Sequence, residues 1–365
     1  MLDVSVAQCH VSLTSSDVGR RAFGALALGG LSAVLAACGD DGAGSASSDP
    51  TVSLTIPSQS LNFSQEAAEG FEFGVGTVAG VTARIGGPSF IDGPEQLRVF
   101  QEFMARPTAG ASVFTTNPQL FARALQAAAG KGIPLIAVDN PPASAAHVGL
   151  FIGNDNAALG RLLADQIIAE LPPGTKDGTV VLGTTTRGAY VLDQRIVGMQ
   201  AEFRERIPGV RVLGPYDTGR SLEENHAGWA ALVEANPDAL AFAGTGDPDA
   251  LSLAALHEES KGDWAAGAFD LEPQALLAVK RGDLVVVSPE HYLKGVLAGR
   301  LLAEHAKHGT PIPAGWIRTP GVGVTKANID EIIARQSSPS AKQQWFREQT
   351  DRLLANPSPQ PMPTP

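Results

Sequence analysis

The chain has 365 residues, of which 44% are hydrophobic and 18% charged, and its net charge at pH 7 is −11. A single core rarely grows beyond about 250–300 residues, so this length predicts two lobes. The acidic balance argues against a nucleic-acid partner and against charge-driven binding to anionic lipid.

The first 37 residues are predicted to be a lipoprotein signal peptide. The pair Arg20-Arg21 precedes an apolar run over residues 22–34, and Leu35-Ala36-Ala37-Cys38 follows it. A positive patch, a short apolar core and small residues before a cleavage site are typical of export signals. The apolar run is too short to span a membrane as a helix. The ending resembles a bacterial lipobox, which implies cleavage before Cys38 and lipid on its sulfur. More than one acyl chain gives a stable membrane anchor.

The export route stays open at this stage. Gly19-Arg20-Arg21-Ala22-Phe23 partly resembles a twin-arginine signal, although Ser or Thr is usual where Gly19 stands. The general route is the alternative. Either way, cleavage removes Cys9 and leaves Cys38 as the one remaining cysteine, so no disulfide is predicted.

Both ends of the mature chain lack a regular pattern. Residues 38–50 hold the lipidated Cys38 and a small, polar stretch that predicts a flexible linker. Residues 357–365 are rich in proline, which disfavours helix and sheet, and are predicted to be disordered.

Between these ends, short apolar runs alternate with helical patterns. The runs are continuous in their apolar character, as expected for parallel strands buried on both faces. This repeated alternation predicts α/β units with right-handed crossovers, and ten strands fit two open sheets. The predicted strands are residues 52–56, 81–85, 111–115, 133–138, 150–153, 179–183, 210–213, 239–243, 265–269 and 284–288.

The helices between the strands carry start and stop signals. Asn117 and Pro118 predict the start of one helix, which should end at Gly130. Ser221 with Glu224 predicts a capping box. Asp155 is expected to cap the following helix at a hinge.

Polar side chains follow many of the predicted strands. In open α/β sheets, ligands bind beyond the carboxyl ends of the strands. Carboxylates, amides and aromatic rings there suit a neutral, polyhydroxylated ligand. Simpler roles stay open: Asp139 as a turn former, Asp247 or Asp270 as helix caps, and Phe63 as core. The candidate contacts are Asn62, Phe63, Asp139, Asn140, Tyr190, Asp247, Asp270 and Glu290.

No enzyme, metal or cofactor signature is apparent. Residues 74–80 are glycine-rich but run into a strand rather than follow one, which is the wrong order for a dinucleotide loop. His305 and His308 lie one turn apart without an evident third ligand. Neither a Gly-x-Ser-x-Gly elbow nor a Gly-Lys-Ser/Thr loop occurs. We therefore predict no catalysis, no metal and no cofactor.

Several ordered segments resemble the type I periplasmic sugar-binding proteins of ABC importers. Together they cover roughly residues 52–333. They are Ser60-Leu61-Asn62-Phe63, Ile136-Ala137-Val138-Asp139-Asn140, Gly153-Asn154-Asp155-Asn156, Gly160-Arg161, Arg195-Ile196-Val197-Gly198-Met199, Thr245-Gly246-Asp247-Pro248, Ala268-Phe269-Asp270 and residues 322–329.

The resemblance implies an α/β fold of two Rossmann-like lobes with parallel sheets, joined by a three-strand hinge. The crossings would fall near residues 149–155, 288–290 and 319–322. The N-terminal lobe would comprise residues 51–150 plus 289–318, and the C-terminal lobe residues 151–288 plus 319–335. A C-terminal helix over residues 336–356 would follow.

The resemblance also implies roles for single residues. Asp139, Asp270 and Arg195, the arginine of an Arg-x-x-Gly pattern, would contact the ligand, with Asn62 and Phe63 from the first loop. A surface position in a helix's first turn is the alternative for Arg195. Departures from the family pattern are Asn140 where Arg is common, Gly246 where Asn is common, and Pro289-Glu290-His291 where Gln or Asn is usual. A polyol, a smaller sugar or a sugar-derived signal therefore stays open as ligand.

The function implied is an extracytoplasmic solute-binding lipoprotein that captures a sugar or polyol-like molecule and delivers it to an ABC permease. It would be a monomer, anchored to the cell membrane on its periplasmic or extracellular side through Cys38, with no nucleic-acid partner. A ligand-sensing subunit for a membrane receptor or kinase is the alternative, and a secreted glycosidase is a third hypothesis.

Overall fold

The computed structural model describes residues 49–363. The predicted signal peptide and Cys38 lie outside the described residues. Within them the chain forms two sheets of six strands each, with helices between the strands along the sequence. The predicted α/β fold with two mostly parallel sheets is confirmed.

The first sheet is entirely parallel and has the order β11-β5-β4-β3-β1-β2. Both of its faces are covered, which is why its strands are apolar throughout. Phe71 and Leu297 pack on one face and Phe100 and Phe121 on the other. Its elements are β1 Thr51–Thr55, α1 Asn62–Gly76, β2 Thr82–Gly86, α2 Gly93–Met104, β3 Gly110–Phe114, α3 Pro118–Gly130, β4 Leu135–Val138, the short 3-10 helix Ser144–Ala146, β5 Leu150–Gly153, α9 His291–His308 and β11 Gly315–Arg318.

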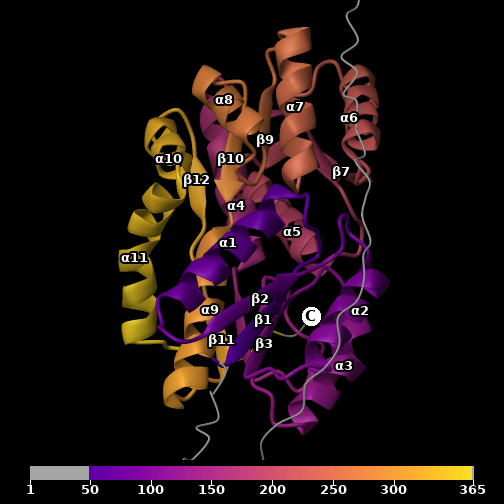
Figure 1. The fold of residues 1–365 in the computed structure, drawn as a ribbon. Coiled ribbons are helices and arrows are strands. Elements are labelled where there is room, and N and C mark those ends of the chain that lie inside the picture. The colour runs from indigo at the N-terminus through magenta and orange to yellow at the C-terminus, as the bar shows by residue number, and fades with distance from the viewer. Residues whose placement is uncertain (1–48, 364–365) are drawn as a thin grey trace, which may run out of the picture. The chain divides into compact units, whose positions relative to one another are not determined.

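The second sheet has the order β12-β10-β9-β8-β6-β7 and is parallel except for the pair β10–β12. Figure 1 shows it above the first sheet, beside α6, α7 and α8. Phe203 packs on one face and Trp229 on the other. Its elements are α4 Asn156–Glu170, β6 Asp177–Thr184, α5 Tyr190–Arg206, β7 Gly209–Asp217, α6 Leu222–Ala235, β8 Ala241–Ala243, α7 Asp247–Ser260, β9 Ala265–Phe269, α8 Pro273–Arg281, β10 Val285–Ser288, β12 Val322–Val324 and α10 Ile329–Gln336.

All ten predicted strands appear, with ends displaced by a few residues, and β11 and β12 are additional. The helix signals also hold. Asn117 accepts a hydrogen bond from the Leu120 amide, Ser221 and Glu224 form the capping box, and Asp155 accepts from the Ala158 amide.

The chain passes between the sheets after β5, after β10 and after β11. A further passage follows α10, because Ile329 and Ile332 of α10 belong to a core of the second sheet, whereas Phe346 of α11 (Pro339–Ala355) belongs to a core of the first. Figure 1 shows α10 and α11 following one another along one side of the molecule. The C-terminal segment therefore touches both lobes.

The proline-rich end differs in one respect from the expectation of disorder. Gln360 forms an antiparallel bridge with Trp316 of β11, with two backbone hydrogen bonds of 2.8 Å. Gln360 itself supplies both the amide and the carbonyl of this bridge, so the prolines near it in the sequence do not prevent the pairing.

Helices α9 and α1 pack backbone against backbone at glycine positions. A Cβ on Gly70 would stand 2.0 Å from the carbonyl oxygen of Tyr292, and one on Gly295 would stand 2.1 Å from that of Ala67. Any larger residue would push the two helices apart. This packing fixes the first turn of α9, which carries His291 and Lys294.

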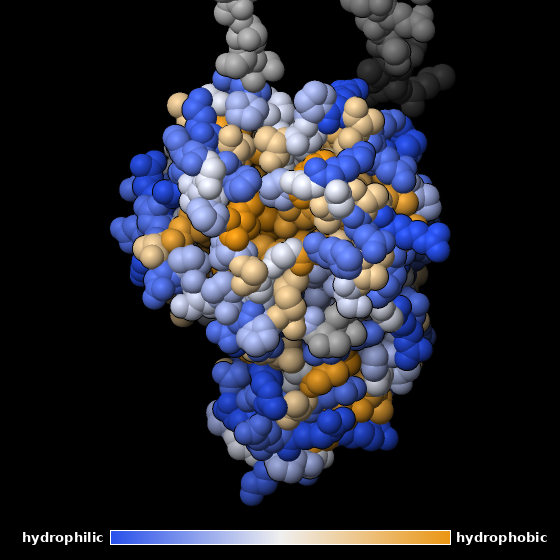
Figure 2. Space-filling view, turned by 90° about the horizontal axis from the view of Figure 1, so that it is seen from below, coloured by the Kyte–Doolittle hydropathy of each residue, from blue (hydrophilic) through white to orange (hydrophobic). Residues whose placement is uncertain are grey.

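Figure 2 shows hydrophilic residues over most of one face of the molecule and hydrophobic residues gathered in a hollow near its middle. Among residues 49–363, every helix falls short of the length and apolarity that crossing a membrane would require.

Candidate ligand-binding site

A cavity lies between the lobes, at the carboxyl ends of strands from both sheets. It measures about 120 Å³, and since one water needs roughly 10–15 Å³ of such space, a molecule the size of a monosaccharide fits. The first lobe contributes Leu61, Phe63, Ile91, Phe114, Thr116, Asp139, Asn140 and His291. The second contributes Thr185, Thr186, Ala189, Val191, Leu192, Arg195, Arg220, Gly246, Asp247, Pro248 and Asp270.

Asp139 follows β4 directly and pairs with a lysine that has no exposure to solvent. The Lys294 Nζ lies 2.5 Å from Asp139 Oδ1, and both side chains are buried. Burial alone would raise the pKa of Asp139. The charges of Lys294, His291 and Arg195 outweigh burial and lower this pKa to about 2. Burial lowers the pKa of Lys294 despite the neighbouring carboxylate. Asp139 is thus an ionised acceptor.

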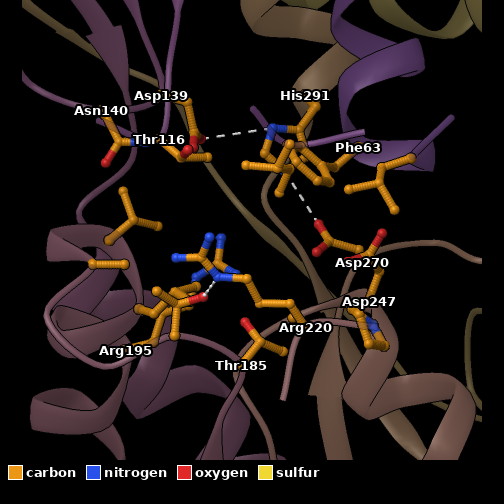
Figure 3. Close-up of a pocket in the computed structure, with 18 of the residues that line it drawn as sticks. Phe63, Thr116, Asp139, Asn140, Thr185, Arg195, Arg220, Asp247, Asp270 and His291 are labelled. Atoms are coloured by element: carbon orange, nitrogen blue, oxygen red, sulfur yellow. Dashed lines mark hydrogen bonds and ion pairs between the residues drawn. The ribbon is translucent and has the colours of Figure 1, made fainter. Parts of the chain in front are cut away.

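His291 connects the carboxylates of the two lobes. Its Nε2 lies 3.1 Å from Asp270 Oδ1, and its Nδ1 lies 3.6 Å from Asp139 Oδ1. Figure 3 shows the imidazole between these two aspartates. His291 therefore links the ends of β4 and β9 across the cavity.

Three strand ends at the cleft hold a left-handed backbone conformation. Asp139, Asp270 and Glu290 follow β4, β9 and β10, with φ angles of 68°, 76° and 58°. Such a conformation costs a residue with a Cβ about 1 kcal/mol or more, and it persists only where surrounding contacts hold it. Backbone strain in the described residues thus concentrates at this site.

Arg195 lies in the first turns of α5 and is almost completely buried, so it is not a surface residue. Its Nη1 donates to the Thr245 carbonyl at 2.6 Å and its Nε to Asn156 Oδ1 at 3.2 Å. The guanidinium lies 4.1 Å above the centre of the Phe269 ring. Burial lowers the pKa of Arg195, while nearby Asp270, Asp139 and Asp247 oppose that shift. In Figure 3, Arg195 and Arg220 reach the cavity opposite His291.

The loop Thr245–Asp247 is organised by a carboxylate outside the cavity. Asp249 Oδ2 accepts from the backbone amides of Thr245 and Gly246 at 2.7 and 3.1 Å. Its Oδ1 accepts from Trp229, Asn225 and Thr218. Asp249 thus places both the carbonyl that Arg195 contacts and the adjacent Asp247.

One wall of the cavity is aromatic. The ring centres of Phe63 and Phe114 lie 5.5 Å apart, and those of Phe114 and His291 lie 5.7 Å apart in a stacked arrangement. An aromatic wall of this kind covers the C–H face of a ring while polar groups around it take hydroxyls. The cavity is therefore amphipathic.

Of the predicted site residues, the structure brings six to this cavity and places three elsewhere. Phe63, Asp139, Asn140, Arg195, Asp247 and Asp270 line it. Asn62 begins α1 but does not reach the cavity, and Tyr190 lines two adjoining depressions. Glu290 turns away because its carboxylate is buried against the guanidinium of Arg335. The alternative cap roles are not observed, since Gly246 and Glu272 are the N-caps of α7 and α8.

His291 lines the cavity and Lys294 pairs with Asp139, but neither was among the predicted site residues. The left-handed turn at Glu290 sends the following residue, rather than Glu290 itself, into the cleft. Residues three positions apart on a helix lie on the same face, so their spacing predicts that the side chains of His291 and Lys294 lie close together. Thr116, Thr185 and Arg220 of the lining were also missed.

The carboxyl group of Asp247 is harder to ionise than that of an exposed aspartate. Burial first, and then the charges of Asp270 and Glu272, raise the pKa of Asp247 well above its ordinary value. A raised pKa contributes stability that is present at low pH and lost as pH rises through the folded-state pKa. We expect Asp247→Asn to retain ligand affinity and to remove that loss. Melting temperatures recorded as the pH rises from about 4, near the pKa of an unfolded aspartate, would measure it.

Asp270→Asn is the matched control, because Asp270 contacts His291 directly and its loss should weaken binding. An Asp247→Asn variant that loses affinity as strongly as Asp270→Asn would show that ligand binding needs the carboxylate of Asp247.

Comparisons with known proteins agree with this architecture. Residues 52–311 match the family model described as "Periplasmic binding protein domain". A search among curated proteins found no match. Similar solved structures include a solute-binding protein from Agrobacterium vitis with bound D-fucose, which is 21% identical with a TM-score of 0.71 and covers 78% of this chain and 98% of its own.

Two further structures are similar to the same extent. A solute-binding protein from Burkholderia graminis in complex with D-arabinose is 21% identical, has a TM-score of 0.70, and covers 77% of this chain and 96% of its own. GanP, a glucose-galactose binding protein from Geobacillus stearothermophilus, is 20% identical, has a TM-score of 0.67, and covers 76% of this chain and 98% of its own. At these identities the likeness concerns the fold.

Proposed function

Because this chain belongs to the periplasmic binding protein domain family, we propose that it captures a neutral, hydroxyl-rich small molecule between its lobes. The ligand would be a sugar or a polyol, and the loaded protein would deliver it to the permease of an ABC importer. The chain itself would perform no chemistry on the ligand. The sugars named for the three similar structures support this ligand class.

One observation carries the proposal. Asp139 of the first lobe and Arg195 and Asp270 of the second line the same cavity, with His291 between the two carboxylates. Carboxylates accept hydrogen bonds from hydroxyl groups, and a guanidinium donates to hydroxyl oxygens through its planar fork. A ligand with hydroxyls on several sides would contact both lobes at once.

The charges in and below the cavity favour an uncharged ligand. The carboxylates Asp139 and Asp270 face the basic side chains Arg195, Lys294 and Arg220, and burial disfavours the charged form of Asp247. An added anion or cation would lie within a few ångströms of a like charge, which is costly in a buried cleft. Neutral hydroxyls meet no such cost.

Contact with both lobes provides the mechanism of capture. A ligand that touches both lobes binds a closed arrangement better than an open one and shifts the population toward it. The lobes proposed to move are those built on the two sheets, predicted as residues 51–150 plus 289–318 and residues 151–288 plus 319–335, except that residues 151–153 of β5 belong to the first sheet. The closed form would present surfaces of both lobes to the permease.

We also propose the cellular setting. The family is extracytoplasmic, and a lipid anchor on Cys38 would hold the monomeric protein at the outer face of the cell membrane, with residues 39–50 as a tether. The sensing alternative shares the same cleft.

The test is a binding screen of the purified chain by calorimetry and thermal shift. We expect at least one neutral pentose, hexose, deoxysugar or alditol to bind. A ligand at about 100 times its Kd would add about 2.7 kcal/mol to the free energy of unfolding. The matching uronic acid and amino sugar should bind much more weakly. Absence of any response to the neutral compounds, or a preference for a charged one, would contradict the proposal.

A further inference from the structure

We propose that Arg335, which lies outside the cleft, is a positioning residue for the ligand site. Its ion pair with Glu290 holds the left-handed turn from which His291 enters the cavity. The inference rests on the proposed function, since it concerns the affinity of that same cavity. It makes the C-terminal part of the chain, beyond the matched residues 52–311, a determinant of ligand binding.

The ion pair is bidentate and buried. Arg335 Nη1 donates to Glu290 Oε2 at 2.9 Å and Nη2 donates to Oε1 at 2.7 Å. The side chains of Arg335 and Glu290 are 2% and 0% exposed. Two parallel charge-assisted hydrogen bonds fix the orientation of both groups, which a single point contact would not do. Loss of either partner would leave the other charge buried without its hydrogen-bonded counter-ion.

The guanidinium also contacts two aromatic rings. It lies 5.4 Å from the ring centre of Trp345 and 5.0 Å from that of Phe346, both on α11. Phe346 belongs to the core of the first lobe and stacks on Tyr292, the second residue of α9. Arg335 is therefore placed by the same core that places the start of α9.

Glu290 is the residue through which this constraint reaches the cavity. Its φ and ψ angles are 58° and 53°, and it stands directly before α9. Its amide donates to Ser288 Oγ at 3.2 Å, and its carboxylate makes the pair with Arg335. A residue with a Cβ relaxes out of this conformation unless contacts hold it. Rotation here would displace His291, the next residue, from Asp139 and Asp270.

The experiment compares Arg335→Ala with Arg335→Ala/Glu290→Gly. Glycine adopts a positive φ without strain and carries no carboxylate, so the double variant restores the turn without the ion pair. Two quantities are measured: the Kd for the tightest compound of the binding screen, and the resonance of the His291 imidazole in the ligand-free protein, assigned with His291→Gln.

We expect Arg335→Ala to raise the Kd by about tenfold or more and to shift or broaden the His291 resonance. The double variant should recover both. Arg335→Lys keeps the charge but loses the bidentate geometry, so its Kd and His291 resonance should lie between those of wild type and Arg335→Ala. It replaces Arg335→Ala in the test if that variant does not fold. Arg300→Ala is the matched control, because Arg300 pairs with Asp351 of α11 at the surface and should change neither quantity.

A lower melting temperature for Arg335→Ala, with an unchanged Kd and an unchanged His291 resonance, would overturn the proposal. Failure of Glu290→Gly to restore either quantity would overturn it as well. The His291 resonance is measured without ligand. If wild type binds nothing in the screen, the proposed function is refuted, and the resonance still shows whether Arg335 positions His291.

Discussion

Replacing Asp139 by asparagine should abolish tight ligand binding and destabilise the protein together. The amide cannot neutralise Lys294, whose side chain is 0% exposed and whose Nζ lies 2.5 Å from Asp139 Oδ1. Removing one partner of a buried pair costs about 3–5 kcal/mol, because the other charge stays buried alone. Calorimetric titration and chemical denaturation of the variant would measure the two losses.

A double variant separates the two effects. In Asp139→Asn/Lys294→Met the buried positive charge is gone, and methionine fills a similar volume. We expect the double variant to recover most of the free energy of unfolding but none of the affinity, because the ionised acceptor is still missing. Recovered affinity would remove Asp139 from the ligand site.

The same pair sets a pH dependence at the acid end. Asp139 has a folded-state pKa of about 2, below its unfolded value of about 3.9. For a lowered acid pKa, the stability contribution is present above the unfolded value and is lost as pH falls toward the folded one. Wild type should therefore lose this contribution between about pH 4 and about pH 2, and Asp139→Asn should not.

The second large effect is expected at Asp249, which lies outside the cavity. Asparagine keeps one acceptor oxygen for Trp229, Asn225 and Thr218, but it turns an NH2 toward the backbone amides of Thr245 and Gly246. Two buried donors would then face a donor, so we expect a loss of about 3 kcal/mol or more in the free energy of unfolding. Urea denaturation would measure it.

The change should also weaken ligand binding, because the loop supplies the Thr245 carbonyl that Arg195 contacts. Asp238→Asn is the matched control: it makes the same chemical change at an exposed site of the same lobe and should leave stability and affinity unchanged. A stable Asp249→Asn with wild-type affinity would show that its hydrogen bonds do not organise the site.

Local sequence was sufficient to predict those features that depend on residues only a few positions apart. The apolar runs predicted ten of the twelve strands, because parallel strands covered by helices on both faces are apolar throughout. The caps at Asn117, Asp155 and Ser221 were readable since each involves an amide only three residues ahead. Strand ends were predictable for the same reason, and they led to Asp139 and Asp270.

Contacts between distant residues were not readable in this way. Lys294 and Asp139 are 155 positions apart, and Arg335 and Glu290 are 45 apart. Nothing near Glu290 shows that its carboxylate turns from the cleft toward α10, so the prediction chose it over His291. Asp249 resembled an ordinary residue of a helix's first turn until the fold brought Trp229 and Asn225 to it.

The sequence by itself determined the two-sheet α/β architecture and the strand ends at which the binding groups stand, because apolar periodicity and capping act over a few residues. Only the tertiary structure decided which of those groups share a cavity, which carboxylate is charged and which residue turns inward. These properties depend on burial and on charges from distant segments, and they exist only once the chain has folded.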